Sequence, residues 1–319
     1  MRTIVVIPNH LPHLDFLQEW QPYLADKEII IMQDVGDKPK IPAGYTNVTI
    51  YDHSDVKKDL GKAEWIIPTQ SSACRSYGYY KAWDRGADVI MTLDNDCFPD
   101  GSDFFQGHLD NLSAKVTLDW VPNTSDLDFT RGFPYEIRNC SPVAISHGLW
   151  SSVPDLDGMD MIRMPGLRLE PSTESLVIPR NSFYAMCGMN LAWDANFTPA
   201  MYFGIFGPKY GFDQYDDIWA GVLSKKIVDY FRHGVISGYP SVEHRKQSNR
   251  YVNLKKQLPG LEMNEHFWIA VQDIQLTATG IAGAYRELIE KLPDTFTGEP
   301  EGYTKKFKEA ALLWANLFE

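Results

Sequence analysis

Residues 89–101, VIMTLDNDCFPDG, join an apolar run to three polar residues and then to a turn. Residues 89–93 are β-branched or large and apolar, a pattern typical of a central strand that is covered on both faces. The Pro-Asp-Gly sequence that follows favours a turn. Asp94, Asn95 and Asp96 are therefore predicted on the loop that leaves the carboxyl end of a buried strand.

In open α/β sheets this edge is where ligands bind. Asp94 and Asp96 would repel each other on such a loop, and a divalent cation offsets that cost. Oxygen ligands suit Mg²⁺ or Mn²⁺, so the loop is a candidate metal–diphosphate site. The alternative is a solvated turn, because Asp and Asn are common in turns.

The surrounding sequence predicts an α/β fold. Apolar runs TIVVIP, EIIIMQD, NVTIYD and AEWIIP alternate with helical patterns near 14–24 and 70–86, as in a doubly wound, mainly parallel, Rossmann-like nucleotide-binding half. Helical periodicity returns at YDDIWAGVLSKKIVDYFRHG and in the segments 262–292 and 303–318. We expect a nucleotide-sugar-binding domain over residues 1–258 and a C-terminal helical appendage over residues 259–319.

Composition narrows the class of partner. The chain of 319 residues carries a net charge of −12, which disfavours broad binding to nucleic acid or anionic membranes. No apolar run reaches the about 18 residues of a membrane span. The four cysteines are widely spaced, so we expect no disulfide framework and a cytoplasmic location.

Two further residues are candidates at the same edge of the sheet. Asp34 follows EIIIMQ, where a carboxylate can accept hydrogen bonds from a uracil N–H or ribose hydroxyls; the alternative is a turn residue. Arg75 lies near a predicted helix start in SSACRSYG, where a guanidinium can hold a diphosphate in a fork. The alternative for Arg75 is a surface ion pair.

Acidic and imidazole groups later in the chain are also candidates. Asp216 and Asp217 begin the helix of YDDIWAG, where the helix dipole favours acids whether or not they are catalytic. His244 follows a short predicted strand in SVEHRKQS and is a possible third metal ligand, although single histidines are more often structural.

The middle of the chain contributes loop motifs. TRGFPYEIR carries Arg131 and Arg138, and AMCGMNLAWD (residues 185–194) is predicted to be a buried wall and not a redox centre. Taken separately, TRGFPYEIR and SHGLWSSVPDLDG are each also compatible with an exposed surface loop that has no functional role. The motif SHGLWSSVPDLDG supplies His147, Trp150, Asp155 and Asp157.

The order of these fragments is more specific than any one of them. QDVGD, SSACRSYGY, LDNDCF, RGFPYEIR, SHGLW, PDLD, CGMNLAWD, PAMYFG and YDDIWAG together resemble the reversibly glycosylated polypeptides, also called UDP-arabinopyranose mutases, from about residue 3 to residue 275. Of the matching fragments, the stretch from CGMN to YDDIWAG is the least expected to match by chance. The family usually has three consecutive acids where this chain has Asp94, Asn95 and Asp96.

The resemblance implies a glycosyltransferase A-type fold, a UDP-sugar substrate, Mn²⁺ or Mg²⁺, and interconversion of pyranose and furanose rings. It also implies self-glycosylation at the first arginine of the R-G-x-P motif, here Arg131. No G-x-G-x-x-G follows the first predicted strand, so we expect neither flavin nor NAD. A transferase with a separate acceptor and a self-glycosylating scaffold remain alternatives, and a homo-oligomer is possible.

The roles expected from the pattern and the resemblance fall into four groups. Metal ligands are Asp94, Asp96 and His244, and nucleotide contacts are Asp34, Arg75, Asp94 and Asn95. Substrate contacts are His147, Trp150, Asp155 and Asp157, and catalytic groups are Arg131, Arg138, Asp216 and Asp217.

Overall fold

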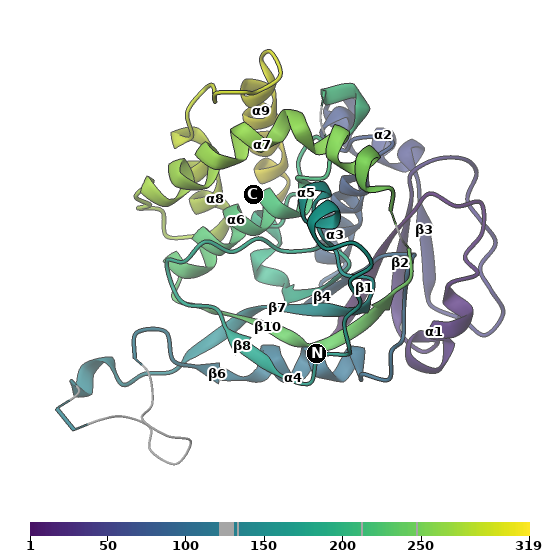
Figure 1. Ribbon diagram of the computed structural model, residues 1–319, viewed down its shortest axis with the longest axis horizontal. Coiled ribbons are helices and arrows are strands. Elements are labelled where there is room, and N and C mark those ends of the chain that lie inside the picture. Colours follow the sequence, from purple (N-terminus) through teal and green to yellow (C-terminus); the bar gives the residue numbers. More distant parts are fainter. Residues whose placement is uncertain (121–130, 133, 212, 247) are drawn as a thin grey trace.

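The computed structural model describes residues 1–120, 131–132, 134–211, 213–246 and 248–319. A twisted mixed sheet lies between helices, with the strand order β3-β2-β1-β4-β9-β7-β10-β5 (Figure 1). Two short strands join it at one side, β6 on β7 and β8 on β10. The α/β class predicted from the sequence is confirmed.

The first half of the sheet is parallel. It consists of β1 (Thr3–Asn9), β2 (Glu28–Gln33), β3 (Val48–Tyr51) and β4 (Val89–Leu93), with β1 at the centre between β2 and β4. All five residues of β4 are buried, as its continuous apolar run predicts. The parallel order brings the carboxyl ends of β1, β2 and β4 to one edge.

The second half of the sheet mixes strand directions. Strand β9 (Asn190–Asp194) runs antiparallel to both β4 and β7, whereas β7 (Ser141–Ser152) and β10 (Gly234–His244) are parallel. Strand β5 (Cys97–Phe98) pairs antiparallel with the end of β10, which places His244 opposite Cys97. The remaining strands are β6 (Lys115–Val116) and β8 (Ser175–Val177).

Helices cover both faces of the sheet. One face packs against α1 (Leu17–Leu24) and α4 (Phe104–Ser113). The opposite face packs against α2 (His53–Leu60), α3 (Arg75–Asp84) and α6 (Asp216–Tyr230), and the C-terminal helices extend this layer (Figure 1). These helices are α7 (Arg250–Asp273), α8 (Ile281–Lys291) and α9 (Tyr303–Ala315), and the short α5 (Gly158–Arg163) packs on α7.

Short 3₁₀ helices fill several connections. They are η1 (Gly61–Ile66), η2 (Ser72–Cys74), η3 (Tyr135–Ile137), η4 (Ala195–Ala200), η5 (Pro208–Tyr210) and η6 (Asn316–Phe318). The strand predicted for AEWIIP is wrong, because η1 covers most of it. Its apolar side chains still pack on the core, so their burial is satisfied by a helical turn instead of a strand.

Helix α7 bears on the expected division of the chain. It runs from Arg250 to Asp273 with Pro259 inside it, and its buried residues include Gly260, Met263 and Phe267. The boundary between residues 258 and 259 therefore falls inside a continuous helix, and a division into two domains stays a prediction. None of the described helices is long and apolar enough to cross a membrane.

Candidate active site

A cavity of about 890 Å³ lies at the carboxyl ends of β1, β2 and β4. Its wall includes the loop after β4, the loop after β7, the segment before β9 and the first turn of α6. Nearly all the site residues predicted from the sequence line this cavity. They are Asp34, Arg75, Asp94, Asn95, Asp96, His147, Trp150, Asp155, Asp157, Asp216, Asp217 and His244.

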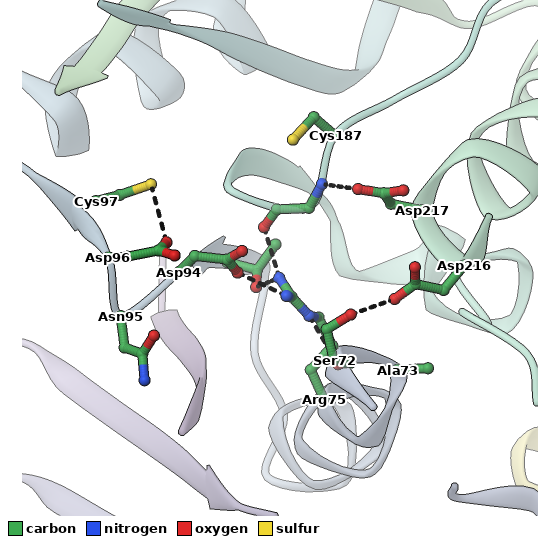
Figure 2. Close-up of polar contacts among 12 residues, drawn as sticks. Ser72, Ala73, Arg75, Asp94, Asn95, Asp96, Cys97, Cys187, Asp216 and Asp217 are labelled. Carbon is green, nitrogen blue, oxygen red and sulfur yellow. Dashed lines mark hydrogen bonds and ion pairs between the residues drawn. The ribbon is translucent and has the colours of Figure 1, made fainter. Parts of the chain in front are cut away.

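Arg75 is buried at the floor of the cavity, with 2% of its surface exposed. Its Nε donates to the Ser72 carbonyl at 3.0 Å, and its Nη1 donates to the Gly188 carbonyl at 2.6 Å. Its Nη2 lies 2.6 Å from Asp94 Oδ1, at ion-pair distance but outside good hydrogen-bond geometry (Figure 2). Most donors of the guanidinium are thus engaged within the protein, which makes Arg75 a connector of three segments.

The charge of Arg75 is secured by its surroundings. Burial opposes protonation, but the nearby carboxylates, Asp94 first, raise the pKa of Arg75 above the ordinary arginine value. A fork of two parallel hydrogen bonds to a diphosphate would require Arg75 to give up contacts to Gly188 or Asp94. The predicted nucleotide contact of Arg75 stays a prediction.

The predicted metal ligands come from two segments that line the cavity, the loop after β4 and the end of β10. Asp96 Oδ2 lies 3.3 Å from Lys246 Nζ, while Asp94 faces Arg75. His244 Nδ1 lies 2.9 Å from the Val153 carbonyl, which only accepts, so Nδ1 carries the proton. In neutral His244 this leaves Nε2 with a free lone pair, the form that binds metals.

Three other side chains with potential metal-ligand atoms lie close together in this cavity. Within the described residues, one ligand atom each from Asp155, Cys187 and Asp217 lies within 4.8 Å of the other two. Asp94, Asp96 and His244 do not form such a group here. The Cys187 thiol donates to Asp155 Oδ2 at 3.0 Å. The Gly188 amide donates to Asp217 Oδ2 at 2.9 Å (Figure 2).

All three groups have pKa values above their ordinary ones. Desolvation raises the pKa of Asp155, and for Cys187 the thiol pKa is raised by burial and then by the charge of Asp155. The pKa of Asp217 is raised well above its ordinary value by desolvation and then by the neighbouring Asp216. The cluster can therefore exchange protons with a ligand or release them to bind a cation.

Asp216 lies beside this cluster in the first turn of α6 and is 5% exposed. The Ser72 hydroxyl donates to Asp216 Oδ2 at 2.5 Å. Desolvation raises the pKa of Asp216 to about 6, against the lowering effect of that hydrogen bond. A carboxyl group with this pKa can act as an acid or a base near neutral pH.

Asp34 joins the end of β2 to the start of η2. Its carboxylate accepts from the amides of Gln70 and Ser71 at 3.0 and 3.1 Å, and His53 Nε2 lies 2.9 Å from Oδ1. The Asp34 side chain is 7% exposed. This geometry fixes the loop at the nucleotide edge, and the predicted uridine contact of Asp34 stays a prediction.

The residues predicted to bind the sugar differ in their freedom to do so. His147 Nε2 accepts from the Cys187 amide at 3.0 Å, and Nδ1 lies 2.6 Å from the Tyr184 hydroxyl. Burial lowers the pKa of His147 to about 3, so this ring is neutral and positions Cys187. Asp157 caps α5 through the Asp160 amide at 2.8 Å. Trp150 Nε1 is buried and has no hydrogen-bond partner among the described residues.

Arg131 and Arg138 are absent from the described residues that line the cavity. Arg131 is exposed, and the Arg138 guanidinium lies over the Tyr135 ring at 3.7 Å from its centre. The described residues directly before β7, 134–140, extend away from the sheet (Figure 1). Their catalytic role stays a prediction.

Sequence reasoning missed Cys187 and Ser72 as site residues. The segment of Cys187 was predicted to be a buried wall, and the cysteine is indeed buried, but its thiol faces the Asp155 carboxylate. One signal was present in the sequence: Cys187 and Gly188 break the run of large apolar residues directly before a strand.

The fold and cavity define an α/β protein with a cavity rich in aspartates at the carboxyl edge of its parallel strands. The chain belongs to the reversibly glycosylated polypeptide family, whose model matches residues 2–319. It is 34% identical to a probable UDP-arabinopyranose mutase 1 from Pisum sativum, over 99% of this chain and 90% of the relative. The UDP-arabinopyranose mutase 1 proteins of Arabidopsis thaliana and Oryza sativa subsp. japonica are 34% and 33% identical, over 99% of this chain and 91% and 90% of theirs.

A solved structure of mouse xyloside xylosyltransferase 1 in its apo form is 8% identical and matches with a TM-score of 0.29. The match covers 73% of this chain and 76% of that chain.

Proposed function

We propose that the protein is a UDP-sugar mutase, which interconverts the pyranose and furanose forms of a UDP-linked sugar of the UDP-arabinopyranose type. The observation that carries the proposal is the 34% identity to UDP-arabinopyranose mutase 1 over 99% of the chain. The cavity supports it, because carboxyl groups with raised pKa values and the residues predicted to bind a cation, Asp94, Asp96 and His244, line the same cavity.

The reaction requires proton transfers that this site can supply. When a pyranose contracts, the ring oxygen leaves C1 and gains a proton, while another hydroxyl loses a proton and attacks C1. Asp216, with a pKa of about 6, and Asp217, whose pKa is raised by desolvation and by Asp216, are suited to hold and return these protons. The cavity also retains the sugar and the UDP while the bond between them is broken.

A divalent cation, Mn²⁺ or Mg²⁺, fits the charge of the cavity. Among the described lining residues, nine are aspartates and three are lysines or arginines, so an added diphosphate would be strongly repelled. Asp94, Asp96 and the free Nε2 of His244 would hold the cation near the nucleotide edge. When bound, it stabilises charge on the departing diphosphate.

Self-glycosylation at Arg131 is part of the proposal. The guanidinium is a poor nucleophile because it is almost always protonated, so the reaction needs a nearby base. Asp216 or Asp217 would supply one if Arg131 reaches the cavity. We also propose a cytoplasmic location, a UDP-sugar as the small-molecule partner, and assembly into a homo-oligomer.

Two other functions are compatible with the same cavity. A transferase would release UDP only when a separate acceptor is added. A self-glycosylating scaffold would take up one sugar per chain and leave the free nucleotide sugar unchanged.

The test is incubation with UDP-arabinopyranose, UDP-galactose, UDP-glucose or UDP-xylose plus Mn²⁺, followed by chromatography of the nucleotide sugars. We expect a furanose product from one of them, and no product from an Asp217→Asn variant that still binds UDP. Unchanged nucleotide sugars with all four substrates would contradict the mutase proposal.

A further inference from the structure

A chain of buried amide side chains ties the loop after β4 to the ends of β1 and β2. Asn95 Nδ2 donates to Asn9 Oδ1 at 2.8 Å, and Asn9 Nδ2 donates to Gln33 Oε1 at 2.7 Å. The three residues are 7%, 1% and 1% exposed. Asn9 and Asn95 also line the large cavity, so the chain of amides forms its floor at the nucleotide edge.

Backbone carbonyls fix the direction of every hydrogen bond in this chain. Gln33 Nε2 donates to the carbonyls of Leu11 and Val35 at 3.1 and 2.6 Å. Carbonyl oxygens only accept, so the Gln33 amide has one possible orientation and its Oε1 must face Asn9. Asn9 Nδ2 donates to this oxygen and to the Leu11 carbonyl at 2.7 Å. Asn9 Oδ1 is therefore an acceptor, and its partner at position 95 must be a donor.

A carboxylate at position 95 conflicts with this order. It would place an anionic oxygen against Asn9 Oδ1 in a buried site, where two acceptors that face each other are both left without a donor. If Asn9 turned over to donate to the carboxylate, its oxygen would then face the Leu11 carbonyl and Gln33 Oε1. The conflict moves along the chain and is not removed.

We propose that Asn95 is a positioning residue whose amide group is required. It locks the loop after β4 to β1 and β2, so that Asp94 and Asp96 are presented to the cation and the diphosphate while residue 95 is turned into the protein. Asn95 is then not a cation ligand, although it lies between two of them. The inference rests on the proposed function for the role of the flanking aspartates, whereas the donor requirement stands on the hydrogen bonds alone.

The chain offers a matched control. Asn249 caps α7 and uses only its side-chain oxygen, which accepts from the amides of Tyr251 and Val252 at 3.0 and 3.2 Å. An aspartate serves equally well as a helix cap. Asn249→Asp therefore adds the same charge as Asn95→Asp without removing a required donor.

The first measurement is thermal unfolding without ligands. We expect Asn95→Asp to unfold at a lower temperature than Asn95→Ala, because alanine removes a hydrogen bond whereas aspartate adds a repulsion. Asn249→Asp should match the unsubstituted protein. An Asn95→Asp protein as stable as the unsubstituted one would overturn the donor requirement.

The second measurement is calorimetry of UDP binding with and without Mn²⁺. We expect the factor by which Mn²⁺ tightens UDP binding to fall about tenfold in Asn95→Asp, equivalent to about 1.4 kcal/mol, with metal-free UDP binding little changed. Tighter Mn²⁺-dependent binding in Asn95→Asp would show that residue 95 faces the cation and would overturn the proposal. If the unsubstituted protein shows no Mn²⁺ effect, the proposed metal dependence fails, and the unfolding temperatures alone decide whether Asn95 must donate.

Discussion

Replacement of Arg75 by Ala tests whether this guanidinium is a connector inside the protein. The change leaves the Asp94 carboxylate without its ion-pair partner and the carbonyls of Ser72 and Gly188 without their donors. Breaking a buried pair by removing one partner costs about 3–5 kcal/mol. Asp94 is 23% exposed to the cavity, so partial hydration places our expectation for the loss of unfolding free energy near the lower end, about 3 kcal/mol.

The assay is urea denaturation followed by tryptophan fluorescence, with Arg245→Ala as the control. Arg245 pairs with Glu19 and Glu243 at 2.7 Å each, but its side chain is 41% exposed, so its removal should cost less than about 1 kcal/mol. A stability loss for Arg75→Ala no larger than that of the control, together with weakened UDP binding, would refute the connector role. Arg75 would then be a direct ligand of the diphosphate.

Three other predictions address the metal, the acid pair and the arginines. Asp96→Asn removes a charged oxygen ligand, so UDP binding should lose its dependence on Mn²⁺ in calorimetry while the fold persists. The pKa of Asp216 is about 6 in the folded protein against an ordinary 3.8, so its contribution to stability is present below pH 4 and is lost as pH rises through 6. That loss is about 3 kcal/mol at most, and a parallel urea series on Asp216→Asn should lack it. Arg131→Lys should abolish radiolabel transfer from a UDP-sugar and ring interconversion but leave UDP binding intact, with Arg138→Lys milder; a sugar-sized mass adduct on the Arg131→Lys protein would exclude Arg131 as the attachment point.

The sequence predicts the parallel half of the fold, and it predicts which loops line the cavity. The run at 89–93 and the turn after it were enough to place Asp94 and Asp96 at the cavity, because a parallel sheet has one ligand-binding edge. The local sequence pattern was also enough to predict that Asp216 and Asp217 begin a helix, which is α6.

Contacts between segments that are distant in the sequence could not be predicted from local sequence patterns. Strand β9 inserts antiparallel between β4 and β7, a pairing across about a hundred residues that no periodicity encodes. The engagement of Arg75 depends on the Gly188 carbonyl, 113 residues away. AEWIIP was assigned as a strand because a short apolar run cannot distinguish a strand from a helical turn that buries the same side chains.

Helix α7 has a consequence for how the C-terminal region communicates with the site. Gln257 lines the cavity, and Phe267, ten residues further along the helix, stacks on Trp219 with ring centres 4.2 Å apart. At 1.5 Å per residue these two points are about 15 Å apart along the axis of α7. Trp219 belongs to α6, the helix that begins with the acid pair. Stacking of Phe267 on Trp219 therefore couples α7 to α6, so a displacement of α7 would move both Gln257 and the helix that carries Asp216 and Asp217.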